Sequence, residues 1–175
     1  MTDLRARAAA VRLLVLDVDG VLTDGGLYYD AQGRVTKRFD VQDGLGIKLA
    51  QQVGLDVAVI TGLNHGAVES RIRELGIVEY HAGHLDKIPL MQGILDRLGL
   101  DWNQAAYLGD DWVDAGVLRR VGIPMAVPNA RNVVRELAAW IASSSGGHGA
   151  VREAIEFLLD CRGELDSLWQ KWSGE

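Results

Sequence analysis

Short apolar runs alternate with segments of helical periodicity along most of the chain, and this alternation restricts the possible folds more than any other feature. The runs are too short for helices and mostly apolar, which is typical of parallel strands buried on both faces; they occupy residues 13–16, 57–60, 77–80, 105–108 and 123–127. The helical segments occupy residues 44–53, 67–75, 87–98, 113–121 and 132–140. A glycine follows each of the first four, where a left-handed C-cap is favoured: Gly54, Gly76, Gly99 and Gly122. This order predicts an α/β fold with a doubly wound parallel sheet.

Two stretches depart from the alternation. Between about residues 24 and 40, two short apolar segments flank the turn-rich tetrad Asp30-Ala31-Gln32-Gly33, which predicts a β-hairpin flap projecting after the first strand. From about residue 143 to 175, a flexible-looking Ser/Gly tail, residues 143–149, precedes a C-terminal helical segment. We expect residues 1–175 to form one domain that contains both features.

Charge and cysteine content exclude several classes of protein. The formal net charge of −6 argues against a nucleic-acid partner. Apolar stretches are all far shorter than the roughly 20 residues that span a bilayer, so no membrane partner is expected. A single cysteine, Cys161, forms neither an internal disulfide nor a cysteine-rich zinc site, which favours a cytoplasmic location.

Polar residues gather where the predicted strands end. The first run is followed by Asp17-Val18-Asp19-Gly20, the second by Thr61-Gly62, and the fourth by Gly109-Asp110-Asp111 with Asp114 one turn later. Lys87 begins a helix between the second and third of these clusters. In a doubly wound fold these positions meet at the carboxyl edge of the sheet. Carboxylates gathered there repel one another unless a cation neutralises them, and hard oxygen ligands suit Mg²⁺.

These residues, in this order, resemble the signature of the haloacid dehalogenase (HAD) superfamily from Leu13 to about Pro128. The resemblance implies a Rossmann-like phosphatase in which Asp17 attacks phosphorus and forms an aspartyl-phosphate. Asp19 is then the general acid and base, while Thr61 and Lys87 stabilise the phosphoryl group.

The metal ligands implied by the same resemblance are Asp17, the backbone carbonyl of Asp19, and Asp110. Asp111 and Asp114 complete the shell or hold the loop, and Gly20 lets backbone amides approach the phosphate. A receiver-type phosphoacceptor domain uses similar residues and is the alternative from another class. Its phosphoacceptor closes the third strand after an acidic pair on the first, an order that this chain does not follow.

The spacing of the motifs leaves no room for a cap domain. The interval from Thr61 to Lys87 fits one βα unit, and the interval from Asp17 to Thr61 fits the hairpin plus one helix and strand. An uncovered site is poorly shielded from water, so we expect a neighbouring subunit to cover it.

Four stretches resemble the capless branch that contains the 3-deoxy-D-manno-octulosonate 8-phosphate phosphatases, at residues 17–24, 39–47, 109–111 and 146–153. The branch implies a Mg²⁺-dependent hydrolase of a phosphorylated 2-keto-3-deoxy sugar acid, in lipopolysaccharide precursor synthesis. It also implies a homotetramer with shared active sites, assembled by the hairpins, in which the Gly-rich tail reaches toward a neighbouring site.

Three positions leave the sugar open. Leu63, Gln42 and His148 stand where many members of the branch carry arginine, the side chain best suited to a carboxylate. Thr61, Gly62 and His148 are the candidate substrate-binding residues, and other cations considered for the carboxylate are His65, Arg71 and Arg73. A phosphatase acting on a nine-carbon, sialic-acid-type sugar 9-phosphate remains the alternative enzyme.

Overall fold

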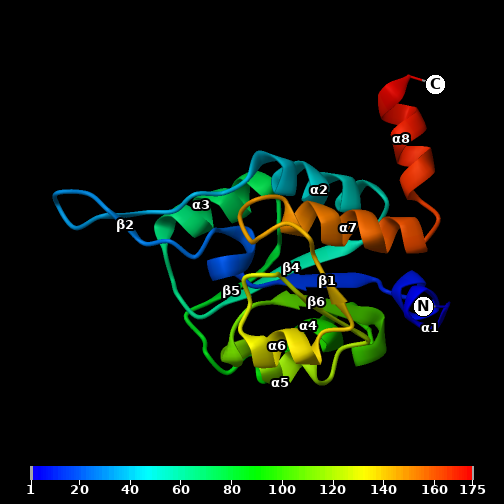
Figure 1. The fold of residues 1–175 in the computed structure, drawn as a ribbon, viewed down its shortest axis with the longest axis horizontal. Coiled ribbons are helices and arrows are strands. Elements are labelled where there is room, and N and C mark those ends of the chain that lie inside the picture. Colours follow the sequence, from blue (N-terminus) through cyan, green and yellow to red (C-terminus); the bar gives the residue numbers. More distant parts are fainter. Residues whose placement is uncertain (1, 175) are drawn as a thin grey trace.

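A six-stranded parallel sheet forms the centre of the molecule in the computed structural model, which describes residues 2–174. The strands lie in the order β5-β4-β1-β6-β7-β8 (Figure 1). Their bounds are β1 Leu13–Leu16, β4 Asp56–Thr61, β5 Glu79–Ala82, β6 Ala105–Gly109, β7 Ile123–Ala126 and β8 Trp140–Ile141. The predicted doubly wound α/β fold is confirmed.

Helices cover both faces of this sheet (Figure 1). One face carries α2 (Val41–Gln52), α3 (Gly66–Leu75) and α7 (Ala150–Cys161), and the other carries α4 (Ile88–Leu98), α5 (Ala115–Leu118) and α6 (Asn132–Leu137). The remaining helices are α1 (Thr2–Ala9) at the start of the described chain and α8 (Leu165–Ser173) at its end. Short helical turns follow β1 and β6 at η1 (Val18–Leu22) and η3 (Trp112–Asp114), and a third, η2 (Trp102–Gln104), precedes β6. No helix among residues 2–174 combines the length and the apolar character needed to cross a membrane.

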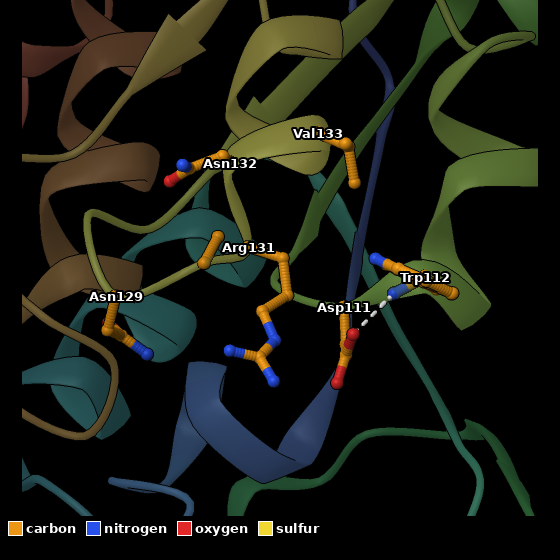
Figure 2. A pocket seen from close by; sticks show the side chains of 7 residues that line it. Asp111, Trp112, Asn129, Arg131, Asn132 and Val133 are labelled. Carbon is orange, nitrogen blue, oxygen red and sulfur yellow. Dashed lines mark hydrogen bonds between the residues drawn. The ribbon is translucent and has the colours of Figure 1, made fainter.

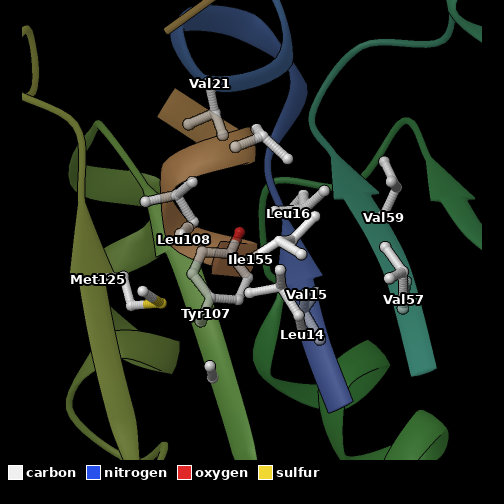
Figure 3. Packing of buried hydrophobic residues seen from close by; sticks show 14 of the residues in the cluster. Leu14, Val15, Leu16, Val21, Val57, Val59, Tyr107, Leu108, Met125 and Ile155 are labelled. Carbon is white, nitrogen blue, oxygen red and sulfur yellow. The ribbon is translucent and has the colours of Figure 1, made fainter. Parts of the chain in front are cut away.

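The core explains why the strand sequences are continuously apolar. All four residues of β1 are fully buried, because β1 has a strand on each side and helices above and below. Tyr107 of β6 lies fully buried in the same cluster, near Val15 and Ile155 (Figure 3). Its hydroxyl is the one polar group drawn in this packing, and it faces the functional end of the sheet described below.

The sixth strand differs from the prediction. The helix expected over residues 132–140 ends at Leu137, since Ala138 adopts an extended conformation and Trp140 and Ile141 pair with β7. The Trp140 ring stacks on Phe157 of α7 with centroids 5.3 Å apart. This tertiary contact, which helical periodicity does not reveal, favours the strand. The third strand is also displaced by two residues, to Glu79–Ala82.

Three of the four predicted C-cap glycines have positive φ, namely Gly54, Gly76 and Gly99. The prediction is wrong for Gly122, which is outside the left-handed region. A Cβ on Gly122 would lie 2.2 Å from the backbone oxygen of Asn103, so close approach of two backbones requires this glycine.

The predicted hairpin is present as β2 (Tyr28–Tyr29) and β3 (Val35–Thr36), with Tyr28 opposite Thr36. The Asp30 carboxylate accepts hydrogen bonds from the backbone N–H groups of Gln32 and Arg34, each at 2.9 Å, which fixes the turn. The hairpin extends away from the rest of the chain (Figure 1).

The Ser/Gly segment differs from the flexible tail that its composition predicts. The Gly146 N–H donates to Oδ1 of Asn129 at 2.8 Å, and the Gly147 N–H donates to the Val21 carbonyl at 2.9 Å. A Cβ on Gly146 would lie 1.8 Å from the Gly20 carbonyl oxygen. The segment is therefore packed against the loop after β1 of its own chain, and its glycines serve close backbone contact rather than flexibility.

We predict that Gly146→Ala destabilises the fold. The added methyl group forces apart two backbone segments, so the free energy of unfolding should fall by about 1–3 kcal/mol, or roughly 2–10 °C in Tm. Gly66→Ala is the matched control, because its φ is not positive and a Cβ there meets nothing within 4 Å. Thermal unfolding followed by circular dichroism measures both; equal Tm values would contradict the packing described here.

Candidate active site

The carboxyl ends of three neighbouring strands bring the predicted residues to one edge of the sheet. Asp17 follows β1, Thr61 ends β4 and Asp110 follows β6. Because β1 pairs in parallel with both β4 and β6, these three residues emerge side by side. Thr61 is buried and its Oγ1 accepts a hydrogen bond from the backbone N–H of Leu63 at 3.4 Å.

Lys87 lies at the centre of a buried charged cluster. Its Nζ is 2.9 Å from Oδ1 of Asp17 and 2.7 Å from Oδ1 of Asp114, and it donates to the Tyr107 hydroxyl at 3.0 Å. The Tyr107 hydroxyl donates in turn to Oδ1 of Asp114 at 2.6 Å. Burial disfavours the ammonium ion, but attraction by the two carboxylates outweighs it and raises the pKa of Lys87. Lys87 therefore stays positively charged.

Asp114 holds the loop after β6. Its Oδ2 accepts hydrogen bonds from the backbone N–H groups of Asp110 at 2.9 Å and Asp111 at 3.2 Å. Its Oδ1 accepts from Lys87 and from the Tyr107 hydroxyl, so both carboxylate oxygens of Asp114 are engaged in hydrogen bonds. Asp114 consequently holds the loop that carries Asp110 and Asp111, which is one of the two roles expected for it.

The carboxylates of Asp17 and Asp110 lie close together and repel each other when both are ionised. Together with Asp114 they offer oxygen atoms within 4.8 Å of one another. Burial, then repulsion from neighbouring carboxylates, raises the pKa of Asp17 to about 6 and that of Asp110 to about 8. Since Asp114 is already saturated, Asp17 and Asp110 are the side chains that fit a divalent metal ion with oxygen ligands.

The loop between Asp17 and Asp24 folds tightly over this pair. Gly20 has φ of 87°, and a Cβ there would lie 2.2 Å from Oδ2 of Asp110. Only glycine fits that conformation and that distance, which explains the Asp-x-Asp-Gly pattern physically. Asn129, after β7, donates from Nδ2 to the Gly20 carbonyl at 2.9 Å.

Asp19 is half-exposed and pairs with Lys37, whose side chain is nearly buried. Lys37 follows β3, so the hairpin supplies the partner of the candidate acid–base residue. Sequence reasoning missed Lys37, Asn129 and Tyr107. Their contacts depend on how distant segments fold together, and no local pattern marks them.

The candidate substrate-binding residues are less closely gathered. Gly62 adjoins Thr61 and is half-buried, with the Leu85 side chain so near that a Cβ would lie 2.9 Å from it. His148 is exposed and lines a separate hollow with Gln42, Leu45 and Arg152, which contains none of the four candidate catalytic residues. Asp111 is exposed and its carboxylate accepts from the Trp112 N–H at 2.8 Å.

The other cations considered for the sugar carboxylate are engaged elsewhere. The His65 ring accepts from the Ala67 N–H at 3.2 Å as the N-cap of α3. Arg71 pairs with Glu74 at 2.9 Å and donates to the Asp40 carbonyl, and Arg73 pairs with Glu69 at 3.0 Å. These side chains stabilise α3 and its surroundings.

The chain is similar in sequence and in fold to proteins of known name. No protein-family model matches the chain. It is 40% identical over 164 residues to 3-deoxy-D-manno-octulosonate 8-phosphate phosphatase KdsC of Escherichia coli K12, which covers 94% of this chain and 87% of that protein. A crystal structure of the phosphatase of this name from Moraxella catarrhalis, in complex with magnesium ion, phosphate ion and KDO, superposes with a TM-score of 0.95. It is 36% identical, and the match covers 98% of this chain and 99% of that one.

A third similar protein is a HAD superfamily (subfamily III A) hydrolase from Legionella pneumophila, with a TM-score of 0.95 and 38% identity over 100% of this chain and 96% of that one. Fold, site and similarity together define a HAD superfamily hydrolase without a cap domain among residues 2–174. Within that superfamily, the chain belongs to the 3-deoxy-D-manno-octulosonate 8-phosphate phosphatase family.

We predict that the metal-free protein loses stability as pH rises from about 5 to about 8.5. The pKa of Asp17 and of Asp110 is higher in the folded chain than the usual value, so folded protein binds more protons, and this stabilisation disappears as pH passes through about 6 and about 8. Mg²⁺ should therefore raise Tm more at pH 8.5 than at pH 5.5, as measured by scanning fluorimetry in Mg²⁺ or EDTA.

The Asp110→Asn variant should separate the effect of carboxylate repulsion on stability from the effect of Mg²⁺ binding. Removing one carboxylate should stabilise the metal-free protein at about pH 8.5 by about 1–2 kcal/mol, or roughly 2–8 °C, and should abolish the Mg²⁺-dependent shift. Asp56→Asn, at the exposed amino end of β4, should change neither quantity. A Mg²⁺ shift of wild-type size in Asp110→Asn would contradict the role of Asp110 in metal binding.

Proposed function

We propose that the protein is a Mg²⁺-dependent phosphatase that hydrolyses 3-deoxy-D-manno-octulosonate 8-phosphate to the free sugar acid and phosphate, for lipopolysaccharide precursor synthesis. The observation that carries the proposal is the buried carboxylate of Asp17, held at 2.9 Å by the Lys87 ammonium with Asp110 beside it. The relatives' names agree with the substrate and do not favour the nine-carbon alternative. Similarity to phosphatases over most of the chain likewise does not favour a receiver domain.

The nucleophile in this proposal is Asp17. Its Oδ1 accepts from the Val18 N–H at 2.7 Å and contacts Lys87, so the carboxylate is fixed in orientation at the end of β1. It attacks phosphorus in line, the bond to the sugar oxygen breaks, and an aspartyl-phosphate forms. Water then attacks this phosphorus and releases inorganic phosphate, which regenerates the Asp17 carboxylate.

Asp19 transfers the protons. In the first step it protonates the leaving sugar oxygen, and in the second it accepts a proton from the attacking water. The Thr61 hydroxyl donates to a phosphoryl oxygen, and Lys87 supplies a fixed positive charge close to Asp17. Mg²⁺ held by Asp17, Asp110 and the Asp19 carbonyl would neutralise negative charge on the phosphoryl oxygens.

Asp17→Asn should abolish turnover of the sugar phosphate, with kcat reduced by at least about 10³-fold, since an amide is not a carboxylate nucleophile. The fold should survive because the side chain keeps its shape and Asp114 still pairs with Lys87 at 2.7 Å. Asp56→Asn is the control for loss of one acidic group. Phosphate release and circular dichroism test both, and appreciable hydrolysis by folded Asp17→Asn would rule out Asp17 as the nucleophile.

Assembly as a homotetramer with shared active sites is the second part of the proposal. The hairpin exposes Leu27, Tyr28 and Tyr29, with 59%, 47% and 65% of their surface accessible. Leu63 and Leu85, next to the site, are also more than half exposed. Clusters of exposed apolar side chains mark interaction surfaces, and a hairpin of two short strands has little stability alone. A second copy packed on the hairpin would bury these side chains and cover the site.

A Tyr29→Glu change should therefore shift the protein toward monomers and lower the activity on the sugar phosphate. Val78→Glu is the matched control. Val78 is 93% exposed but directly precedes β5, so it lies at the amino ends of the parallel strands, away from the hairpin and the site. Sedimentation velocity at micromolar concentration gives the oligomeric state. A wild-type monomer, or an unchanged assembly in Tyr29→Glu, would overturn the hairpin interface.

A cytoplasmic location completes the proposal. It is supported by a single cysteine, which leaves the chain without an internal disulfide. The substrate itself is tested with a panel of eight- and nine-carbon 2-keto-3-deoxy sugar phosphates, assayed for released phosphate. Faster turnover of a nine-carbon member would replace the eight-carbon assignment.

A further inference from the structure

Beside the candidate catalytic residues lies a hollow of about 580 Å³ on the side of the sheet where β6 and β7 end (Figure 2). It is lined by residues that follow β6 and β7, among them Asp111, Trp112, Asn129, Arg131, Asn132 and Val133. The mechanism above uses none of them as a reacting group. A hollow of this size is large enough for part of a sugar.

Two hydrogen bonds to backbone carbonyls connect residues of the hollow with the loops of the site. The Arg131 N–H donates to the Asp110 carbonyl at 2.9 Å, and the Asn129 amide donates to the Gly20 carbonyl at 2.9 Å. Gly20 and Asp110 belong to the two loops that close over the proposed phosphate and metal. The hollow therefore adjoins the two loops that carry the proposed metal and phosphate ligands.

The Arg131 guanidinium is directed into the hollow, between Asn129 and Asp111 (Figure 2). The hydrogen bond drawn among the lining residues joins Asp111 to Trp112, and the Arg131 side chain has no hydrogen bond or ion pair with any residue from 2 to 174. In this it differs from Arg71 and Arg73, which are paired on α3. An unpaired guanidinium retains all five donors for a bound anion.

We propose that Arg131 binds the carboxylate of the sugar acid and so determines the preference for 2-keto acid substrates. The proposal rests on the proposed function, because it requires a substrate with a phosphate at one end and a carboxylate at the other. A planar guanidinium matches a carboxylate with two parallel hydrogen bonds. The nearby Asp111 carboxylate accepts from the Trp112 N–H at 2.8 Å and forms no ion pair with Arg131, so it leaves the guanidinium donors available.

The test compares a substrate that has the carboxylate with one that lacks it. Arg131→Gln should raise KM for 3-deoxy-D-manno-octulosonate 8-phosphate by about tenfold or more and leave kcat within about threefold. Hydrolysis of p-nitrophenyl phosphate, which carries no carboxylate, should stay within about twofold. Arg131→Lys should restore part of the affinity. The backbone contact to Asp110 is present in every variant, so the metal loop is retained.

Arg119→Gln is the matched control, since Arg119 is an exposed arginine after α5 and away from the hollow. Inhibition by the free sugar acid gives a second measurement, and its Ki should rise in Arg131→Gln while that of inorganic phosphate is unchanged. Equal losses on both substrates would show that Arg131 supports the loop instead. Unchanged KM for the sugar phosphate would place the carboxylate elsewhere; either result overturns the proposal.

Failure of the proposed function gives a different result. Wild-type protein would then hydrolyse p-nitrophenyl phosphate but not the eight-carbon sugar phosphate. The same comparison is then made with the nine-carbon sugar acid 9-phosphate, which carries the same type of carboxylate. A rise in KM specific to Arg131→Gln supports the carboxylate site on that substrate, and an unchanged KM rejects it.

Discussion

The buried ammonium group of Lys87 is the interaction on which the rest of the site depends. An unpaired charge in this position would be strongly destabilising, and removing one partner of such a pair typically costs about 3–5 kcal/mol. Asp17 and Asp114 provide the compensating charges, and the Tyr107 hydroxyl satisfies a further donor. The cluster therefore links β1, β6 and the start of α4 through side chains that lie almost completely inside the protein.

The loops above this cluster are arranged by backbone contacts. Asp114 accepts from two N–H groups of the loop that carries Asp110. The Asp110 carboxylate in turn occupies the space that a side chain on Gly20 would need. Asn129 connects the Gly20 carbonyl to the N–H of Gly146 through the two ends of one amide. The loops that carry Gly20 and Asp110 are thus held by hydrogen bonds and close packing that begin at the buried cluster.

Much of the fold and of the site could be predicted from the sequence because both depend on local patterns. Apolar runs marked five strands, and the carboxyl edge of a parallel sheet brought Asp17, Thr61 and Asp110 together. Features decided by tertiary contact could not be predicted. Trp140 enters a strand because it packs on Phe157, and Gly146 is rigidly packed although its neighbours are serine and glycine. Lys37 and Arg131 stand in a hairpin and a loop with no motif of their own, and only the folded chain brings them beside the site.

Asn129 also has a consequence for the order of folding. Its bond to the Gly20 carbonyl spans 109 residues of chain, and its bond to Gly146 adds a segment from the C-terminal part. Contacts between such distant residues form only after a large loss of chain entropy, so they are late and cooperative events. The contacts that hold the loop after β1 are consequently complete only when the segment around Gly146 has packed against it. A chain emerging during synthesis would already contain every proposed catalytic residue by Asp110 and yet remain without an assembled catalytic site.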